Sequence, residues 1–141
     1  MIEEQEFPPA LRLLVVDDEA IVGKRLKQVY GKLGFEVECF TQPADALAAM
    51  ARQPFEIVVT DLRMDGIDGW EVLRQARELN PATRVIVITA YVQEETTLKA
   101  SQQGAFDIIA KPFRLEELRQ VVYAAVEDLQ KQGAATTSAR A

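Results

Sequence analysis

The sequence predicts an α/β protein with a doubly wound parallel sheet, on three observations. Five short apolar segments alternate with five segments of helical periodicity, and helical crossovers join parallel strands in a right-handed sense. The second apolar segment alternates with polar residues, as an edge strand does, whereas the first and third are apolar throughout. Together they give the strand order 2-1-3-4-5, a flavodoxin-like arrangement with a cleft between the first and third strands.

The predicted strands are short and mostly buried on both faces. They cover residues 11–16, 35–40, 57–61, 84–88 and 106–109. The segment 35–40 is the one with clean alternation, so we expect one of its faces to lie in water.

The helices are predicted from apolar residues spaced three or four apart. The second begins with a proline near its first turn, and the fourth is weak because it contains two threonines. The expected inward-facing residues of the first four helices are Val22, Leu26, Val29, Leu33; Leu47, Met50; Trp70, Leu73, Ala76, Leu79; and Leu98, Ala100. The last helix has the most continuous apolar face, made by Leu115, Leu118, Val121, Val122, Ala125, Val126 and Leu129.

The length of 141 residues suits one domain with its own core. We expect a flexible lead-in over residues 1–10, the domain over 11–131 and a disordered tail over 132–141. A net charge of −6 gives no indication of nucleic-acid or membrane binding. With one cysteine, Cys39, and no secretory signal pattern, a cytoplasmic location is expected.

The chain contains no histidine, which excludes His-based triads and His-ligated zinc from its own chemistry. It also excludes a phosphohistidine carried by this chain. A phosphoryl group handled here must therefore come from elsewhere and be held on another residue.

Polar residues gather where the predicted strands end. Asp17 and Asp18 follow the first strand, Asp61 ends the third, Thr89 the fourth and Lys111 the fifth. Each alone has an ordinary explanation as a helix cap, a turn residue or a surface charge, but parallel strands bring all these ends to one edge.

Carboxylates gathered in one cleft repel one another unless a cation neutralises them. The lysine offsets one charge, and a hard, oxygen-seeking Mg²⁺ would offset the others. An aspartate beside Mg²⁺ can attack a phosphoryl donor to form an aspartyl phosphate, stabilised by the metal, the lysine and a nearby hydroxyl.

On these residues, the sequence resembles the response-regulator receiver domain of two-component systems over about residues 11–131. The matching motifs are Val15-Val16-Asp17-Asp18-Glu19, Thr60-Asp61-Leu62-Arg63-Met64, Val87-Ile88-Thr89-Ala90, Gly104-Ala105-Phe106-Asp107 and Lys111-Pro112-Phe113. The resemblance implies a signalling domain, not a conventional turnover enzyme. It also implies a phosphoryl donor, either a sensor histidine kinase or a histidine phosphotransfer protein, and a downstream protein or output domain.

The resemblance implies a role for each site residue. Asp61 would accept the phosphoryl group, with Thr89 moving to hydrogen-bond it and Lys111 pairing with it. Asp18 and Asp61 would ligate Mg²⁺ directly, Asp17 through water, and the main-chain carbonyl of Arg63 would be a further ligand. The bond between Lys111 and Pro112 is expected to be cis. The fourth helix, fifth strand and fifth helix would form the signalling surface.

Three departures from the family pattern matter, and the third involves a pair of residues. Ile108 replaces the usual aromatic residue whose rotamer follows the threonine, and Asp65 replaces a proline. Arg63 and Tyr91 occupy positions that tune the lifetime of the phosphoryl group, and we hypothesise that their bulk shields it from water. Ala90, next to the threonine, is a further switch position.

Other readings fit the residues less well. A dehalogenase-type phosphatase needs a carboxylate at Arg63 and its nucleophile on the first strand, and a flavin module would meet repulsion from Asp17 and Asp18. A calcium loop starting at Asp61 fails at Arg63 and at Val72. A receiver-fold scaffold working without phosphorylation stays open. So do a stand-alone receiver, a part of a longer regulator, and a phosphorylation-dependent homodimer.

Overall fold

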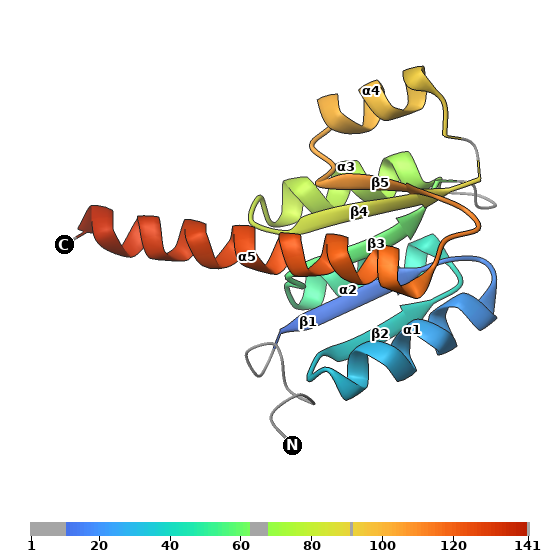
Figure 1. Cartoon of the computed structure of the whole chain (residues 1–141), viewed down its shortest axis with the longest axis horizontal. Coiled ribbons are helices and arrows are strands. Elements are labelled where there is room, and N and C mark those ends of the chain that lie inside the picture. Colours follow the sequence, from blue (N-terminus) through green and yellow to red (C-terminus); the bar gives the residue numbers. More distant parts are fainter. Residues whose placement is uncertain (1–10, 63–67, 91, 141) are drawn as a thin grey trace.

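The computed structural model describes residues 11–62, 68–90 and 92–140, with side chains as far as residue 132. It confirms the predicted α/β fold, with five parallel strands in the order β2-β1-β3-β4-β5 and five helices around them (Figure 1). The strands are β1 (Arg12–Val16), β2 (Glu36–Phe40), β3 (Ile57–Asp61), β4 (Arg84–Thr89) and β5 (Asp107–Ala110). The helices are α1 (Ala20–Lys32), α2 (Pro43–Arg52), α3 (Gly69–Leu79), α4 (Glu94–Gln102) and α5 (Leu115–Arg140).

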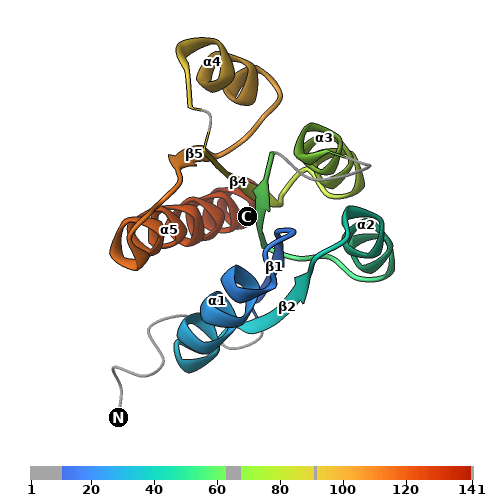
Figure 2. The same cartoon turned by 90° about the vertical axis from the view of Figure 1, so that its right-hand side faces the viewer.

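The sheet is covered on both faces. Figure 2 shows α1 and α5 on one side of the sheet and α2 and α3 on the other. Successive side chains of a strand point to opposite faces, so alternate residues of β1 enter different clusters. Leu13 and Val15 pack with α1 and α5, whereas Leu14 and Val16 pack with α2 and α3. This double coverage explains why the central strands are apolar throughout.

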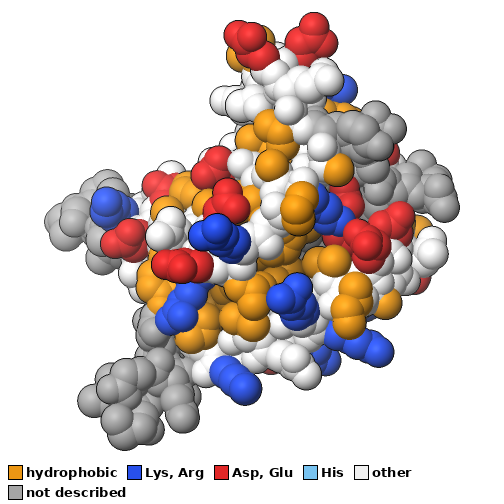
Figure 3. Space-filling model, turned by 45° about the vertical axis from the view of Figure 1, so that its right-hand side comes forward, with side chains coloured by type: hydrophobic (Ala, Val, Ile, Leu, Met, Phe, Trp, Pro, Cys, Tyr) orange, Lys and Arg blue, Asp and Glu red, His pale blue; other side chains and the backbone are white. Residues whose placement is uncertain are grey.

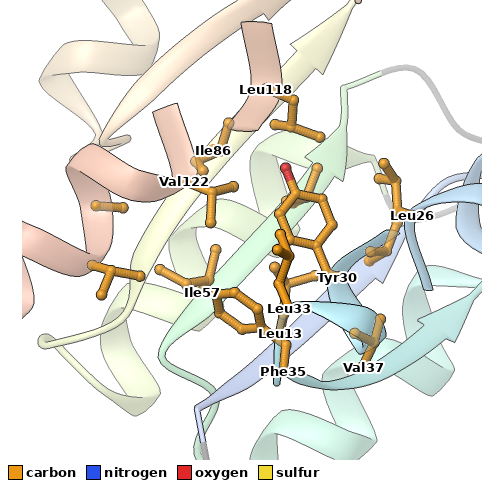
Figure 4. Close-up of a cluster of buried hydrophobic side chains, with 14 of the residues drawn as sticks. Leu13, Leu26, Tyr30, Leu33, Phe35, Val37, Ile57, Ile86, Leu118 and Val122 are labelled. Atoms are coloured by element: carbon orange, nitrogen blue, oxygen red, sulfur yellow. The ribbon is translucent and has the colours of Figure 1, made fainter. Parts of the chain in front are cut away.

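The cluster under α1 and α5 is built around aromatic residues (Figure 4). Tyr30 and Phe35 meet edge to face, with ring centroids 5.6 Å apart. Leu118 and Val122 of α5 close this cluster and are fully buried. The sequence did not predict that Tyr30 faces inward. The apolar spacing of its helix also fits Val29, which was assigned to the inward face instead.

Several expected details differ from the structure. Leu79 is 49% exposed because it is the last residue of α3, and Leu98 is 58% exposed on the outer side of α4. The helix α5 continues to Arg140, and the expected disorder of the tail over residues 132–141 stays a prediction. A single glycine such as Gly133 costs only about 1 kcal/mol inside a helix, which good helix formers nearby can offset. The expected lead-in, residues 1–10, lies outside the described residues.

The helix α4 is attached differently from the other helices. Ala100 is its one buried residue, and α4 lies beyond the β5 edge of the sheet (Figures 1 and 2). The ammonium of Lys99 lies 4.3 Å from the ring centre of Trp70 on α3, a cation–π contact. Thus α4 is held by few apolar contacts, as the weak sequence pattern predicts.

None of the helices that the structure describes combines the length and the apolar character that crossing a membrane requires.

Gly69, the first residue of α3, is packed against the end of β3. A Cβ atom there would lie 2.0 Å from the carbonyl oxygen of Asp61 and 2.5 Å from the Cα of Leu62. Because these are backbone atoms, Gly69→Ala is expected to lower the free energy of unfolding by about 2–4 kcal/mol. Urea unfolding followed by circular dichroism measures this change.

Gly31 is the matched control, since a Cβ atom there meets nothing within 4 Å. Gly31→Ala in α1 should instead stabilise the domain by up to about 1 kcal/mol. Equal unfolding midpoints for the two alanine variants would show that the close approach at Gly69 is not what constrains this position.

Candidate functional site

Three aspartates converge at the edge where the strands end. Asp17 directly follows β1, Asp18 is next, and Asp61 is the last residue of β3. One carboxylate oxygen from each lies within 4.8 Å of the other two. Asp17 is 2% exposed and Asp61 5%, whereas Asp18 is exposed. The pairing of Val16 with Thr60 fixes this arrangement, because it sets the two strand ends side by side.

Lys111 brings a positive charge to the same place from the end of β5. Its Nζ lies 2.8 Å from Asp17 Oδ2, 2.8 Å from Asp61 Oδ2 and 3.0 Å from Glu19 Oε1. The side chain is 15% exposed, so these contacts are largely shielded from water. The peptide bond between Lys111 and Pro112 is cis, as the sequence resemblance implied.

The cluster perturbs its own ionisation. Burial raises the pKa of the Asp17 carboxyl, and the Lys111 ammonium beside it only partly opposes that effect. For Lys111, burial disfavours the charged form, but hydrogen bonds to Asp17, Asp61 and Glu19 outweigh it and raise its pKa. Lys111 therefore stays an ammonium at neutral pH, and the cluster keeps excess negative charge.

This donor set fits a hard divalent cation. The ligand atoms that Asp17, Asp18 and Asp61 offer are carboxylate oxygens, which Mg²⁺ prefers over nitrogen or sulfur donors. Asp17 Oδ2 is buried and, apart from its ion pair with Lys111, has no hydrogen-bond partner among the described residues. A cation would compensate this oxygen, and the exposed side of Asp18 leaves room for the waters that Mg²⁺ retains.

The remaining expected residues lie at or near this edge. Thr89 ends β4, is fully buried, and its carbonyl accepts a hydrogen bond of 2.8 Å from the Lys111 amide. Ala90 after it is exposed. Ile108 on β5 is half-buried and packs against the cluster under α2 and α3. Arg63, Asp65 and Tyr91 lie outside the described residues, so the geometry leaves their expected roles untested.

Comparison with known proteins identifies the family. The model of the response regulator receiver domain matches residues 13–123. The chain belongs to this family. The regulatory protein AtoC of Escherichia coli K12 is 38% identical over 116 residues, which are 82% of this chain and 25% of AtoC. This receiver domain thus spans about a quarter of the length of that relative.

Solved structures agree with this assignment. A CheY-like receiver domain protein from Methanospirillum hungatei JF-1 has a TM-score of 0.83 and 26% identity, over 87% of this chain and 98% of that one. The BeF₃-activated receiver domain of DrrB has a TM-score of 0.77 and 31% identity, over 84% of this chain and 98% of that one. The fold is that of a receiver domain of a two-component response regulator.

The sequence had assigned no role to Glu19, the third acidic residue after β1. Its residue type could have indicated a role. Glu19 is the N-cap of α1, a position where Asp, Asn, Ser and Thr are favoured and glutamate is unusual. Its side chain makes no capping hydrogen bond and instead accepts one from Lys111. Three acidic side chains therefore contact Lys111, and Asp18 lies beside two of them.

A hollow of about 330 Å³ adjoins the acidic cluster. Its lining includes Glu19 and Lys111 on one side and apolar residues of α1 and of the start of α5, Val22, Leu26 and Leu115, on the other. Figure 3 shows hydrophobic side chains (orange) gathered across this face, with acidic (red) and basic (blue) side chains beside them. This face offers a partner protein an apolar contact next to the charged site.

Asp17→Asn tests whether burial of the ionised Asp17 carboxylate destabilises the metal-free fold. Because burial raises the pKa of Asp17, its ionised form is less favourable in the folded than in the unfolded chain at neutral pH. The neutral amide should therefore raise the free energy of unfolding of the metal-free protein. Excess Mg²⁺ should raise the melting temperature of the parent by more than that of the variant.

Urea unfolding in EDTA and thermal scans with Mg²⁺ measure the two effects. A variant that is less stable than the parent in EDTA would mean that the ion pair with Lys111 outweighs the burial of Asp17.

Proposed function

We propose that this receiver domain accepts a phosphoryl group on Asp61 from a phosphohistidine donor in a Mg²⁺-dependent reaction, and that phosphorylation changes a surface read by a partner or output domain. The observation that supports this most directly is the position of Asp61. Its carboxylate ends a buried strand, 2.8 Å from the Lys111 ammonium and beside two more carboxylates.

The proposed reaction is a displacement at phosphorus. An oxygen of the Asp61 carboxylate forms a new bond to phosphorus while the bond from phosphorus to the donor nitrogen or oxygen breaks, and the donor leaves with that electron pair. Asp17, Asp18 and Asp61 would hold Mg²⁺, and Arg63 is proposed to add its main-chain carbonyl. When bound, the metal offsets the negative charge of the transferring group.

Lys111 and Thr89 would act on the transferred group. One N–H of the Lys111 ammonium turns toward a phosphoryl oxygen, where its charge stabilises the transition state. The Thr89 hydroxyl, at the end of the neighbouring strand, donates a hydrogen bond to another. Since neither residue exchanges a proton in this scheme, the receiver prepares the site electrostatically and does not act as an acid or base.

The phosphohistidine must lie outside these 141 residues, because they contain no histidine. A sensor histidine kinase or histidine phosphotransfer protein would bring its phosphohistidine over the acidic edge. The apolar hollow between Glu19 and Leu115 adjoins this edge and would receive part of the donor's surface. The activation of the similar DrrB receiver by BeF₃, a phosphoryl-like group, supports the same chemistry here.

Phosphorylation would change the surface formed by α4, β5 and α5, chiefly through movement of α4. Movement of Thr89 pulls on the segment that leads into α4, which buries only Ala100. Segments with few buried contacts are the ones that move at low free-energy cost. The receiver is about a quarter of the length of AtoC, so we propose that the changed surface acts on an output domain, a separate protein or a second receiver.

The first test is phosphorylation with a small donor. Incubation with Mg²⁺ and acetyl phosphate should add one phosphoryl group to the parent, seen by intact mass, and none to Asp61→Asn. EDTA should abolish the gain. Addition to both proteins would place the acceptor on another residue, and no addition to either with acetyl phosphate or a phosphohistidine protein would favour the phosphorylation-independent scaffold.

The second test uses Trp70, the one tryptophan of the chain, as a reporter of α4. Because Lys99 of α4 lies over its ring, displacement of α4 should change the fluorescence of Trp70. We expect phosphorylation to change the emission of the parent and to change that of Lys99→Met much less. Emission of the parent that stays constant while its mass shows full phosphorylation would argue against a shift of α4.

A further inference from the structure

We infer that Glu19 competes with the incoming phosphoryl group for the Lys111 ammonium and thereby limits how readily Asp61 is phosphorylated. This inference rests on the proposed function and assigns to Glu19 a positioning role, exerted through Lys111.

The Lys111 ammonium can donate only a limited number of hydrogen bonds. An ammonium group has three N–H donors. Three carboxylate oxygens already lie within 3.0 Å of Lys111 Nζ, from Asp17, Glu19 and Asp61. For Lys111 to reach a phosphoryl oxygen on Asp61, one of these contacts must be given up.

The three contacts of Lys111 differ in what their release would cost. The side chain of Asp17 is 0% exposed and that of Asp61 7%, so neither carboxylate would regain water if Lys111 left it. The side chain of Glu19 is 62% exposed, and its carboxylate would be hydrated at once. Because an uncompensated buried charge is costly and an exposed one is not, Glu19 is the contact that Lys111 exchanges.

The ordinary reason for an acidic residue at this position does not apply to Glu19. Glu19 is the N-cap of α1, yet its side chain caps no backbone N–H, and its own amide donates to Asp17 Oδ1. A shorter aspartate would be the better cap. What glutamate adds here is reach, and the atom it reaches is Lys111 Nζ.

The exchange leaves the chemistry of transfer unchanged. With acetyl phosphate as donor, the bond from Asp61 to phosphorus forms, the bond from phosphorus to the acetate oxygen breaks, and acetate leaves with the electron pair. Lys111 keeps its three protons and redirects one N–H from Glu19 to a phosphoryl oxygen. Glu19 therefore stabilises the unphosphorylated state alone.

Two substitutions separate reach from charge. Glu19→Ala removes the carboxylate, whereas Glu19→Asp keeps the charge but is one methylene shorter. Both should be phosphorylated by acetyl phosphate about two- to fivefold faster than the parent, the range expected for loss of a partly exposed ion pair. Both should also bind beryllofluoride in the presence of Mg²⁺ more tightly by a similar factor, which is an equilibrium readout independent of the transfer rate.

Glu36→Ala is the control for net charge. Glu36 is exposed and pairs in register with Arg12 at the other end of the sheet, so this variant should behave as the parent does. Thermal unfolding controls for structure, because Glu19→Asp, with the better cap, should melt no lower than the parent. A faster rate together with undiminished stability is not what a merely structural role of Glu19 would give.

The outcomes are distinct. In one outcome, the parent accepts a phosphoryl group while both Glu19 variants react no faster and bind beryllofluoride no more tightly than it does. That result would overturn this inference and leave the proposed function intact. An increase in Glu19→Ala but not in Glu19→Asp, or an equal increase in Glu36→Ala, would reduce the effect to charge and also overturn it. A parent that takes no phosphoryl group would remove the proposed function and this inference with it.

Discussion

The concentration of carboxylates around one lysine is the constraint on which the rest of this receiver domain depends. Asp17, Asp61 and Glu19 all contact Lys111, and Asp18 adds a fourth negative charge beside them. One ammonium cannot neutralise four carboxylates, so this edge of the sheet keeps a net negative charge that a further cation would reduce. The proposed affinity for a divalent cation, and the proposed need for that cation when a phosphoryl group is added, would both follow from this imbalance.

Such an arrangement requires a rigid support, because repelling charges would otherwise separate. The support is the central pair of strands, β1 and β3, whose side chains are buried on both faces between two helical layers. A shift of register by one residue would turn each of these side chains to the wrong face, so the strand ends are fixed within the core. Gly69 adds a second restraint, since its close contact with the backbone at Asp61 leaves no space for a side chain.

The sequence predicted the fold and most of the site because both depend on patterns that the chain displays directly. The alternation of apolar strands with amphipathic helices indicates the order of the strands in the sheet. The polar residues at the strand ends indicate which edge of the sheet carries the site. Other details depend on where each helix stops packing against its neighbours, and apolar periodicity does not indicate that point. They are the burial of Tyr30, the exposure of Leu79 and Leu98, and the length of α5. The contact from Glu19 to Lys111 joins residues 92 positions apart, and only folding reveals that distance.

The parts of the molecule that can respond to phosphorylation are those that the core does not restrain. The strands and the helices on either face are held by two continuous apolar clusters, and moving them would expose large buried areas. By contrast, α4 buries one alanine and contacts α3 through an exposed lysine, and the Glu19 carboxylate lies mostly in water. The free energy that phosphorylation would supply is small compared with the free energy that holds the core together. It is large compared with the free energy of the contacts made by α4 and Glu19. The low burial of α4 and of Glu19 would therefore allow a change at the buried charge cluster to alter the surface, as proposed.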